Sequence, residues 1–424
     1  MPNQCFFITF AKELKTILKV APDTNQGRIM KRKKLYVLTF ALLAVLCAGL
    51  VSCDNDDNEA LYDNEDTTND DNEDTTGLYV NFVYDYNIQH TDMFKDYVGS
   101  VTLYVFDESD RLVAQRTVSG SELSVYGFNI HFTEQELAPG HQYRLSAVAL
   151  QKDWNAALAT PGAKYRKTTL NTGNRRQQLM VSLDRATATT NNYHEVSTTA
   201  PLDTMWHTKQ VMTAYAANQP TATHYHENAE GETTTNAVET ITLESGVPAY
   251  ATVSLVRNTN HLNISIRELD TPENVDADNY EVFILDANGD VDYQNTVITP
   301  TDSLVYRPYQ QWTTTFDGIT GVERSAHYDL MCNRLIYNTT TDDNAVLCIR
   351  RKSNGKEVAV LNLPYILCEG RTAYETYNYR PQEYLDREYD YRLEFFLRGD
   401  RWVYLTVCID RFSWGKRIQN TSFN

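Results

Sequence analysis

Cys53 is the residue of this 424-residue chain whose surroundings most clearly define a chemistry. It closes the run Leu50-Val-Ser-Cys, in which an aliphatic residue and two small or aliphatic residues precede a cysteine, the pattern of a bacterial lipobox. In such a pattern the thiol takes a diacylglyceryl group, a peptidase cuts before the cysteine, and the new amine is usually acylated. One acyl chain holds a protein to a bilayer only marginally, at about 0.8 kcal/mol per buried methylene, whereas two or three chains give a durable anchor. The sequence therefore predicts lipidation at Cys53.

The residues before Cys53 have the layout of a secretory signal. A basic cluster at residues 30–34 precedes an uncharged apolar run at residues 35–52, so we expect a lipoprotein signal peptide over 30–52. The alternative is a signal-anchor helix that stays in the membrane, but the run is at the short end for a membrane span. Because Met30 begins a complete signal, residues 1–29 are expected to be an upstream, non-native extension. Mapping the N-terminus of the unprocessed precursor would test this.

An acidic segment follows the cysteine. Residues 54–76 contain eleven Asp or Glu, no Lys or Arg, and two copies of Asn-Glu-Asp-Thr-Thr. Such a segment cannot bury enough apolar surface to offset its ordering entropy, so residues 53–76 are expected to form a disordered, self-repelling tether. Fully extended, it would reach about 80 Å from the lipid surface. An acidic patch directly after the lipid-bearing cysteine also resembles the surface-export signal of Bacteroidetes-type lipoproteins, so we expect display on the outside of the cell.

The charge of the chain limits its partners. The net charge is −18, and after residue 52 there remain 30 basic and 54 acidic residues, a net charge of −24. So negative a surface repels phosphate backbones, which disfavours nucleic-acid binding. It also disfavours docking onto anionic lipid through a basic patch.

The body of the chain has the pattern of β-strands throughout. Short runs with partial or clean alternation of apolar and polar residues are separated by turn residues. The strands are expected at residues 77–86, 101–106, 143–150, 178–183, 239–243, 251–256, 262–266, 280–285, 345–349, 357–361 and 402–409. Helices are expected to be few and short, at residues 133–137 and 381–388. Many short strands between turns predict an all-β protein built from sandwiches, not a parallel α/β sheet.

A weak internal repeat indicates two similar domains. Residues 101–107 align with residues 280–286, and the match runs on without a gap to Val118 and Val297. Asn288-Gly289 is expected to be a tight hairpin turn. Two hairpins that match by chance are the alternative. The expected division is an N-terminal domain at 77–235, with a long polar excursion at 186–235, and a C-terminal domain at 236–424.

Other reactive residue types lack the spacing that a site would need. No Cys-x-x-Cys pair occurs among Cys332, Cys348, Cys368 and Cys408, so a zinc site is disfavoured. Disulfides are one alternative for these four cysteines, and buried thiols are the favoured one. His224 and His226 lie in a polar stretch typical of a loop. Residues 286–290 resemble a calcium loop, but its twelfth position is Val297 in place of Glu. No catalytic or nucleotide-binding motif is present, and we expect no metal, no cofactor and no enzymatic activity.

The order of several segments resembles a known family, the FimB-like fimbrial anchor subunits of type V fimbriae (Mfa-like lipoproteins). The resemblance is carried by six segments that together span most of residues 77–424. They are residues 82–87, 101–107, 205–207, 253–265, 384–397 and 403–420. One departure is Thr208 after His207, where a glycine is common in the family.

The resemblance implies two transthyretin-like β-sandwich domains in tandem on an outer-membrane lipoprotein. It also implies a partner, the fimbrial shaft subunits, and a role in anchoring the fimbria, limiting its length and supporting adhesion. A polymer assembled by strand addition needs a subunit with an accepting groove or edge. Which domain accepts a strand is open at this point.

Two other functions stay open. The chain has 28 tyrosines, and exposed aromatic rings stack on sugars or partner proteins, so a surface glycan-binding lipoprotein is one alternative. A fimbrial tip adhesin with the same fold is the other. A neighbouring sugar-import gene set would favour glycan binding, and the position of the protein along the fibre would separate a tip from an anchor.

Overall fold

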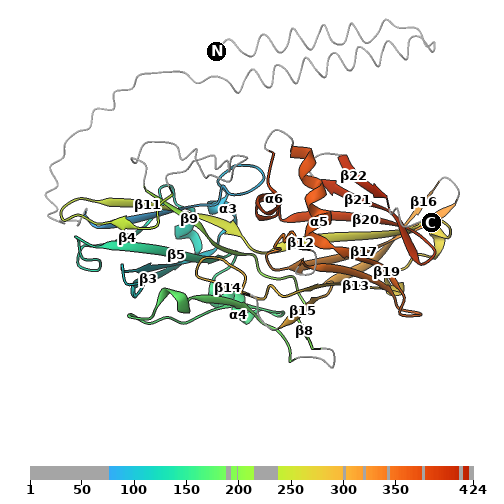
Figure 1. Ribbon diagram of the computed structural model, residues 1–424, viewed down its shortest axis with the longest axis horizontal. Coiled ribbons are helices and arrows are strands. Elements are labelled where there is room, and N and C mark those ends of the chain that lie inside the picture. Colours follow the sequence, from blue (N-terminus) through green and yellow to red (C-terminus); the bar gives the residue numbers. More distant parts are fainter. Residues whose placement is uncertain are drawn as a thin grey trace, which may run out of the picture. The chain divides into compact units, whose positions relative to one another are not determined.

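The described residues belong to one compact unit, residues 72–424. The computed structural model describes residues 76–187, 192–197, 199–213, 237–298, 302–318, 321–340, 344–374, 378–409 and 414–419 (Figure 1). The expected extension at 1–29, the signal at 30–52 and nearly all of the tether at 53–76 lie outside these residues.

The described residues fold almost entirely into strands. The strands are β1 (Leu78–Val83), β2 (Ser100–Phe106), β3 (Leu112–Ser119), β4 (Ile130–Phe132), β5 (Gln142–Leu150), β6 (Tyr165–Lys167), β7 (Met180–Leu183), β8 (Tyr193–Glu195), β9 (Met205–Thr213), β10 (Ile241–Thr242), β11 (Ala249–Arg257), β12 (Asn260–Glu268), β13 (Tyr280–Asp286), β14 (Asp290–Asp292), β15 (Ser303–Tyr306), β16 (Gln310–Asp317), β17 (Val322–Cys332), β18 (Val346–Arg351), β19 (Glu357–Asn362), β20 (Asp390–Arg398), β21 (Arg401–Ile409) and β22 (Trp414–Gln419). The α-helices are α3 (Phe94–Tyr97), α4 (Trp154–Ala159), α5 (Leu363–Cys368) and α6 (Pro381–Arg387). The 3₁₀ turns are η1 (Gly120–Ser124), η2 (Arg176–Gln178), η3 (Pro272–Asn274), η4 (Ala277–Asn279) and η6 (Glu369–Tyr374). The expectation of an all-β fold with few short helices is confirmed.

The N-terminal sandwich is one eight-stranded sheet whose two halves share a core. Its order is β3-β2-β5-β9-β11-β1-β4, with β10 on β5. Alternate residues of β1 and β11, such as Val80 and Val253, enter the same hydrophobic cluster as Leu103 of β2 and Ala147 of β5. Strands far apart in the order can share a cluster only if the sheet turns over on itself. The two layers are therefore β4-β1-β11-β9 and β10-β5-β2-β3 (Figure 1).

Strand β2 is buried on both faces. Leu103 enters the interior of the N-terminal sandwich, whereas Tyr104 and Phe106 enter a second cluster with Val181 of β7 and Trp154 of α4. A small sheet of order β14-β7-β6 contributes to this second cluster. Double coverage explains why the sequence of β2 is a nearly continuous apolar run.

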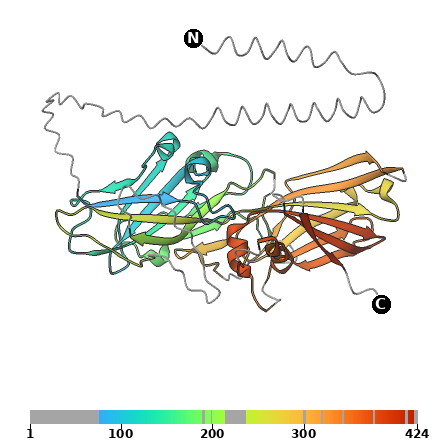
Figure 2. The same ribbon diagram turned by 90° about the horizontal axis from the view of Figure 1, so that it is seen from above.

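The C-terminal sandwich consists of two sheets packed face to face. The six-stranded sheet has the order β16-β17-β12-β20-β21-β22, and the five-stranded sheet has the order β19-β18-β13-β15-β8. Alternate residues such as Ile264 of β12 and Phe395 of β20 meet Ile284 of β13 and Leu347 of β18 in one cluster. Figure 2 shows the same layers from above. The period of two in these strands places their apolar side chains between the sheets.

The two sandwiches share a strand arrangement but not a hairpin. In each, the first strand pairs in parallel with a much later one, β1 with β11 and β12 with β20. The repeated strands, β2 and β13, each lie between two antiparallel neighbours. After them the copies diverge, because β3 pairs with β2 whereas β14 pairs with β7 of the small sheet. The prediction of a hairpin turn at Asn288-Gly289 is therefore wrong.

The second expected helix forms as α6, but the first does not. Residues 133–137 make a single turn in which the amides of Glu136 and Leu137 both donate to the carbonyl of Thr133. The capping contact from the amide of Thr133 to the Glu136 carboxylate is present at 3.0 Å. A capping box fixes how a helix starts, but one turn without a following apolar face does not continue.

Chain crossings link the two sandwiches. Strand β8 of the expected excursion pairs in parallel with β15 of the C-terminal sandwich. Strands β10 and β11 come after residue 235, where a domain boundary is expected, and they pair with strands of the N-terminal sandwich. The chain passes from one sandwich to the other at Asn258 and Thr259, between β11 and β12. No described helix is long and apolar enough to cross a membrane.

Candidate functional site at the junction of the two sandwiches

The predicted lipidation site, Cys53, lies outside the described residues, so its role stays a prediction. Of the four later cysteines, Cys332, Cys348 and Cys368 are buried thiols that form no disulfide. Burial raises the pKa of Cys348 to about 11 and that of Cys368 to about 12. These thiols are therefore protonated at neutral pH and chemically inert. Disulfides, the other expectation for these cysteines, do not form.

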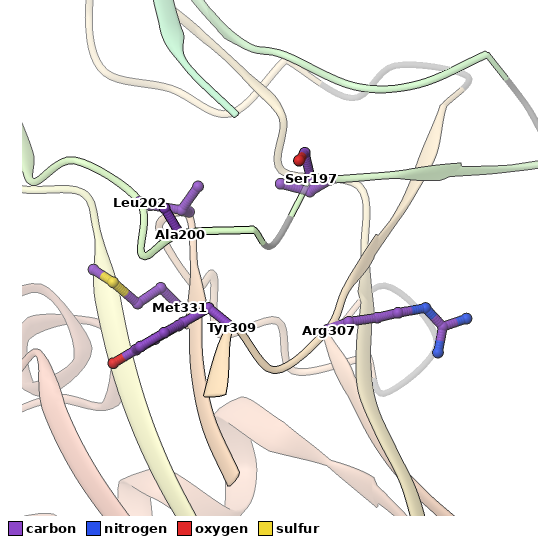
Figure 3. A pocket seen from close by; sticks show the side chains of 7 residues that line it. Ser197, Ala200, Leu202, Arg307, Tyr309 and Met331 are labelled. Atoms are coloured by element: carbon purple, nitrogen blue, oxygen red, sulfur yellow. The ribbon is translucent and has the colours of Figure 1, made fainter. Parts of the chain in front are cut away.

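The hollow in Figure 3 is too small to bind a metabolite. It is lined by Val196, Ala200, Leu202, Tyr309 and Met331, among others, and has room for about one water molecule. Arg307 also borders it, but its guanidinium points away in the figure and is bound to Glu195 and Glu281 at 3.0 and 2.7 Å. This hollow is a packing defect beside two ion pairs.

The described residues offer no metal centre, since they contain no group of three or more His, Cys, Asp or Glu that could hold an ion. The calcium-like loop at 286–290 is occupied otherwise, because both carboxylate oxygens of Asp290 accept from Arg185 at 2.7 and 2.8 Å. His224 and His226 lie outside the described residues.

Buried polar groups concentrate where the two sandwiches meet. We use the word junction for two clusters, one around Asn258 and Thr259 and one around helix α6. In the first, Asn258 and Asn295 exchange side-chain hydrogen bonds at 2.5 and 3.1 Å, and both residues are almost fully buried. The hydroxyl of Thr259 donates to the carbonyl of Asp203 and accepts from the amide of Met205. The link between β11 and β12 is thus fixed by hydrogen bonds on both sides.

The first cluster continues into the C-terminal sandwich. Asn333 Nδ2 donates to the carbonyl of Asn288 at 2.5 Å, and Asn288 Nδ2 donates back to the carbonyl of Asn333 at 3.2 Å. The hydroxyl of Tyr306 donates to Asn288 Oδ1 at 2.6 Å, and that of Tyr165 lies 3.1 Å from the hydroxyl of Thr259. Burial raises the pKa of both tyrosines far above the ordinary value. Such a network of hydrogen bonds between buried groups favours one arrangement of these groups over others.

The second cluster surrounds α6. Asp386, 2% exposed at its side chain, accepts two bonds from Arg334 at 2.9 and 2.7 Å and one from Gln382 at 2.9 Å. Lys209 of β9 lies 3.9 Å from the same carboxylate. Burial alone would raise the pKa of Asp386, but the charge of Arg334 and these hydrogen bonds outweigh it and hold the pKa below its usual value. The carboxylate is therefore ionised and shared between the sandwiches.

Arg387 completes the second cluster. Its side chain is fully buried, its Nε donates to Glu383 at 2.9 Å, and its guanidinium lies 4.0 Å from the ring centre of Tyr86. The amide of Ile88 donates to the carbonyl of Arg387 at 3.1 Å. Tyr86 and Ile88 follow β1, so α6 is attached directly to the segment that leaves the first strand.

His207 of β9 is buried among apolar strands of the N-terminal sandwich. The next residue, Thr208, bridges the ladder to β5, because its hydroxyl accepts from the amide of Ala147 and donates to the carbonyl of the same residue. This threonine fills the position where a glycine is common. Burial lowers the pKa of His207 to about 4. The imidazole is therefore neutral in the folded protein.

Acid should destabilise the fold through His207. Because the folded pKa lies below the unfolded value of 6.5, the unfolded chain binds the proton first as the pH falls. The contribution is fully present above pH 6.5 and is lost by about pH 4, a difference of about 3 kcal/mol. The difference between wild type and a variant without this imidazole, in urea unfolding at pH 7.5 and pH 4.5, measures it, because other groups that titrate in this range are common to both proteins. The matched variant His207→Gln keeps a polar side chain without a titratable group and should lose less stability over this range; equal losses in the two proteins would contradict the assignment.

Comparison with known proteins identifies the family. A model of the fimbrillin-A associated anchor proteins Mfa1 and Mfa2 matches residues 67–420. The chain belongs to the Mfa2 family. The predicted resemblance is thus confirmed, and with it a role in fimbrial anchoring, association with fimbrial subunits and a place at the cell envelope. No curated protein sequence matches the chain.

Solved structures with a similar fold come from Bacteroides and Porphyromonas species. A candidate polysaccharide-binding protein of Bacteroides thetaiotaomicron is 24% identical, with a TM-score of 0.60 over 81% of this chain and 99% of that chain. A candidate adhesin of Bacteroides ovatus is 22% identical, with a TM-score of 0.58 over 82% and 96%. The fimbrial anchor protein Mfa2 of Porphyromonas gingivalis is 16% identical, with a TM-score of 0.47 over 80% and 98%.

In this member of the Mfa2 family, four of the segments that carried the resemblance reach the junction. Residues 82–87 include Tyr86, and residues 253–265 include Asn258 and Thr259. Met205, in residues 205–207, donates its amide to the hydroxyl of Thr259, and residues 384–397 include Asp386 and Arg387. The sequence identified these segments but did not show that they contact one another at the junction. The signal available was polar residues at 258–260 between two long apolar strands without a Gly or Pro.

Proposed function

We propose that this protein is an outer-membrane lipoprotein that anchors type V fimbriae through acyl chains on Cys53, limits their length and supports adhesion without catalysing a reaction. The proposal rests mainly on the lipobox cysteine, which stands fourteen residues before the region that matches the anchor family. The acidic tether between them would present the body outside the cell. The expected signal, tether and tandem domains remain part of the proposal, with the boundary between the domains moved from residue 235 to Asn258 and Thr259, where the strands change sandwich.

The entry of the tether supports a mechanical role. Gly77 leads into β1, which lies between β11 and β4 and is therefore an interior strand. Tension along the chain would load the hydrogen bonds of β1 together, in shear, instead of peeling off an edge. Gly77 has φ +91°, and a Cβ there would lie 2.2 Å from the carbonyl oxygen of Phe132, so only glycine fits this entry.

The junction extends the same argument to the whole body. An anchor holds its polymer under tension, so a flexible link between its halves would yield first. Here the link of Asn258 and Thr259 is buried and is reinforced by Asp386 and Arg387 of α6. The body therefore passes load through buried polar contacts in addition to the two linking residues.

Replacing the acylated cysteine tests the function. Cells that produce Cys53→Ala are expected to lose incorporation of labelled fatty acid into the protein and to release the protein, with attached fimbriae, into the medium. Released fibres should also be longer if the anchor limits length. The measurements are fatty-acid labelling, fractionation and electron microscopy.

Cys47→Ala is the matched control, because Cys47 lies in the same apolar run but outside the lipobox. It should leave labelling, location and fibre length unchanged. Retention of acylated Cys53→Ala protein in the membrane would contradict the anchor. Immunogold label at the distal end of the fibres would favour a tip adhesin.

A further inference from the structure

Among the described strands, β16 is a long sheet edge without the usual protection. It forms one end of the six-stranded sheet, so no strand lies on its far side (Figure 1). It is eight residues long, pairs with β17 without a register shift, and contains no Pro, Lys or Arg. Natural proteins blunt such edges with short strands, bulges, proline or charge, because an open edge pairs with other strands.

The other described sheet ends carry that protection. Strands β4, β6, β8 and β14 have three residues each, and β10 has two. Pairing of β3 and β19 with their neighbours includes a bulge, and the backbone of Leu112 in β3 also bonds to the segment at 173–174. The sequence of β22 holds Lys416 and Arg417. The open edge at β16 is thus an exception within the described part of this fold.

The register shows which backbone groups of β16 are available. Gly318 donates to the carbonyl of Gly321 at 2.7 Å, and this pair continues the register of β16 with β17. In an antiparallel ladder, bonded pairs alternate, so the even-numbered residues of β16 bond to β17. The N–H and C=O groups of Gln311, Thr313 and Thr315 then point to the open side. They offer three donors and three acceptors in the spacing of a strand.

The side chains beside this edge carry an excess of negative charge. The carboxylate of Asp278 accepts a hydrogen bond from Gln311 Nε2 at 2.8 Å, and Asp317 is the last residue of the strand. Within the described residues, neither carboxylate forms an ion pair. The two arginines nearby are occupied, Arg324 by Asp276 at 3.0 Å and Arg267 by Glu394 at 2.9 Å. A segment that adds here would gain from carrying Lys or Arg.

We propose that β16 accepts an extended, basic segment of a fimbrial subunit, which adds to the six-stranded sheet as a seventh strand. This proposal rests on the proposed function for its partner. A second copy of the chain fits less well, because two edges side by side would bring Asp278 and Asp317 against their copies without a cation. Each chain also carries a net charge of −18. Backbone bonds supply the affinity, and the acidic border selects a basic partner.

A proline on the open side of the edge tests the proposal. Thr315 is exposed and its N–H points away from β17, so Thr315→Pro removes a docking group without removing a ladder bond. Thr315→Val, the matched control, keeps the N–H and the strand propensity. The probe is purified fimbriae of the same strain, bound to the full-length protein in detergent. We expect at least tenfold weaker binding for Thr315→Pro and unchanged binding for Thr315→Val.

Hydrogen exchange checks that the effect is local. In wild type, fimbriae should slow exchange at residues 310–317 at least tenfold, and in Thr315→Pro the exchange of β17 without fimbriae should stay as in wild type. If wild type binds and Thr315→Pro binds equally well, the edge proposal is overturned while the anchor function stands. If wild type binds no fimbriae, the anchor function itself fails. If the wild-type protein forms dimers and Thr315→Pro does not, the strand that adds to β16 comes from a second copy of the chain, which also overturns the proposal.

Discussion

Replacing Asp386 with asparagine is expected to lower the free energy of unfolding by about 3–5 kcal/mol, the usual cost of removing one partner from a buried ion pair. The substitution preserves the shape of the side chain and removes its charge. Arg334, whose guanidinium lies 2.7 Å from the carboxylate and is 14% exposed, would then lose its counter-charge in a buried site. Urea unfolding at pH 7 measures the loss. The transition should shift to lower urea with little change in its slope.

The exposed pair of Arg166 and Asp184 supplies the matched control. It has the same two-bond geometry, at 2.5 and 2.9 Å, but the two side chains are 59% and 34% exposed. Asp184→Asn should therefore cost less than about 1 kcal/mol. Similar losses for the two variants would show that burial at the junction is not what makes Asp386 important. If the junction carries load, cells with Asp386→Asn should also shed fimbriae although Cys53 remains acylated.

Strands with a clear apolar pattern were predictable from the sequence, because successive side chains of a strand point alternately into the core and to its opposite face. Every strand expected from its apolar pattern forms within a few residues of its expected ends, but half of the described strands, β16 among them, were not expected. Helix α6 was predictable for a local reason, a proline at its first position. These features depend on neighbours within one or two turns of the chain, which a sequence displays directly.

The junction was not predictable, because its polar residues look like turn residues until their partners are known. Asn288-Gly289 has the composition of a hairpin turn, yet Asn288 bonds to Asn333 and Tyr306, 45 and 18 residues away. Asn258 finds its partner 37 residues later, at Asn295. Local propensity cannot show whether an amide is solvated or buried, since that depends on groups that only the fold brings together.

A rise in pH should destabilise the protein through Asp286, at the end of β13. Its Oδ1 accepts from the amide of Ala287 at 2.7 Å, whereas its Oδ2 is buried and has no hydrogen-bond partner in the described part of the chain. Burial raises the pKa of this carboxyl from 3.8 to about 7. The folded state therefore holds a proton that the unfolded state releases. The stabilisation is complete below pH 3.8 and is lost as the pH rises to about 7, a change of about 4 kcal/mol.

The variants Asp286→Asn and His207→Gln separate the loss of stability at high pH, which comes from Asp286, from the loss of stability in acid, which comes from His207. The stability of Asp286→Asn relative to wild type should rise between pH 5 and pH 8, because the variant has no carboxyl to ionise at this position. The variant should still lose stability in acid through protonation of His207. His207→Gln should show the reverse, a smaller loss in acid and the same decline toward pH 8 as wild type. Because the two groups lie in different sandwiches, their contributions should add in the double variant. A pH profile of Asp286→Asn parallel to that of wild type would mean that the carboxyl is solvated in the folded protein.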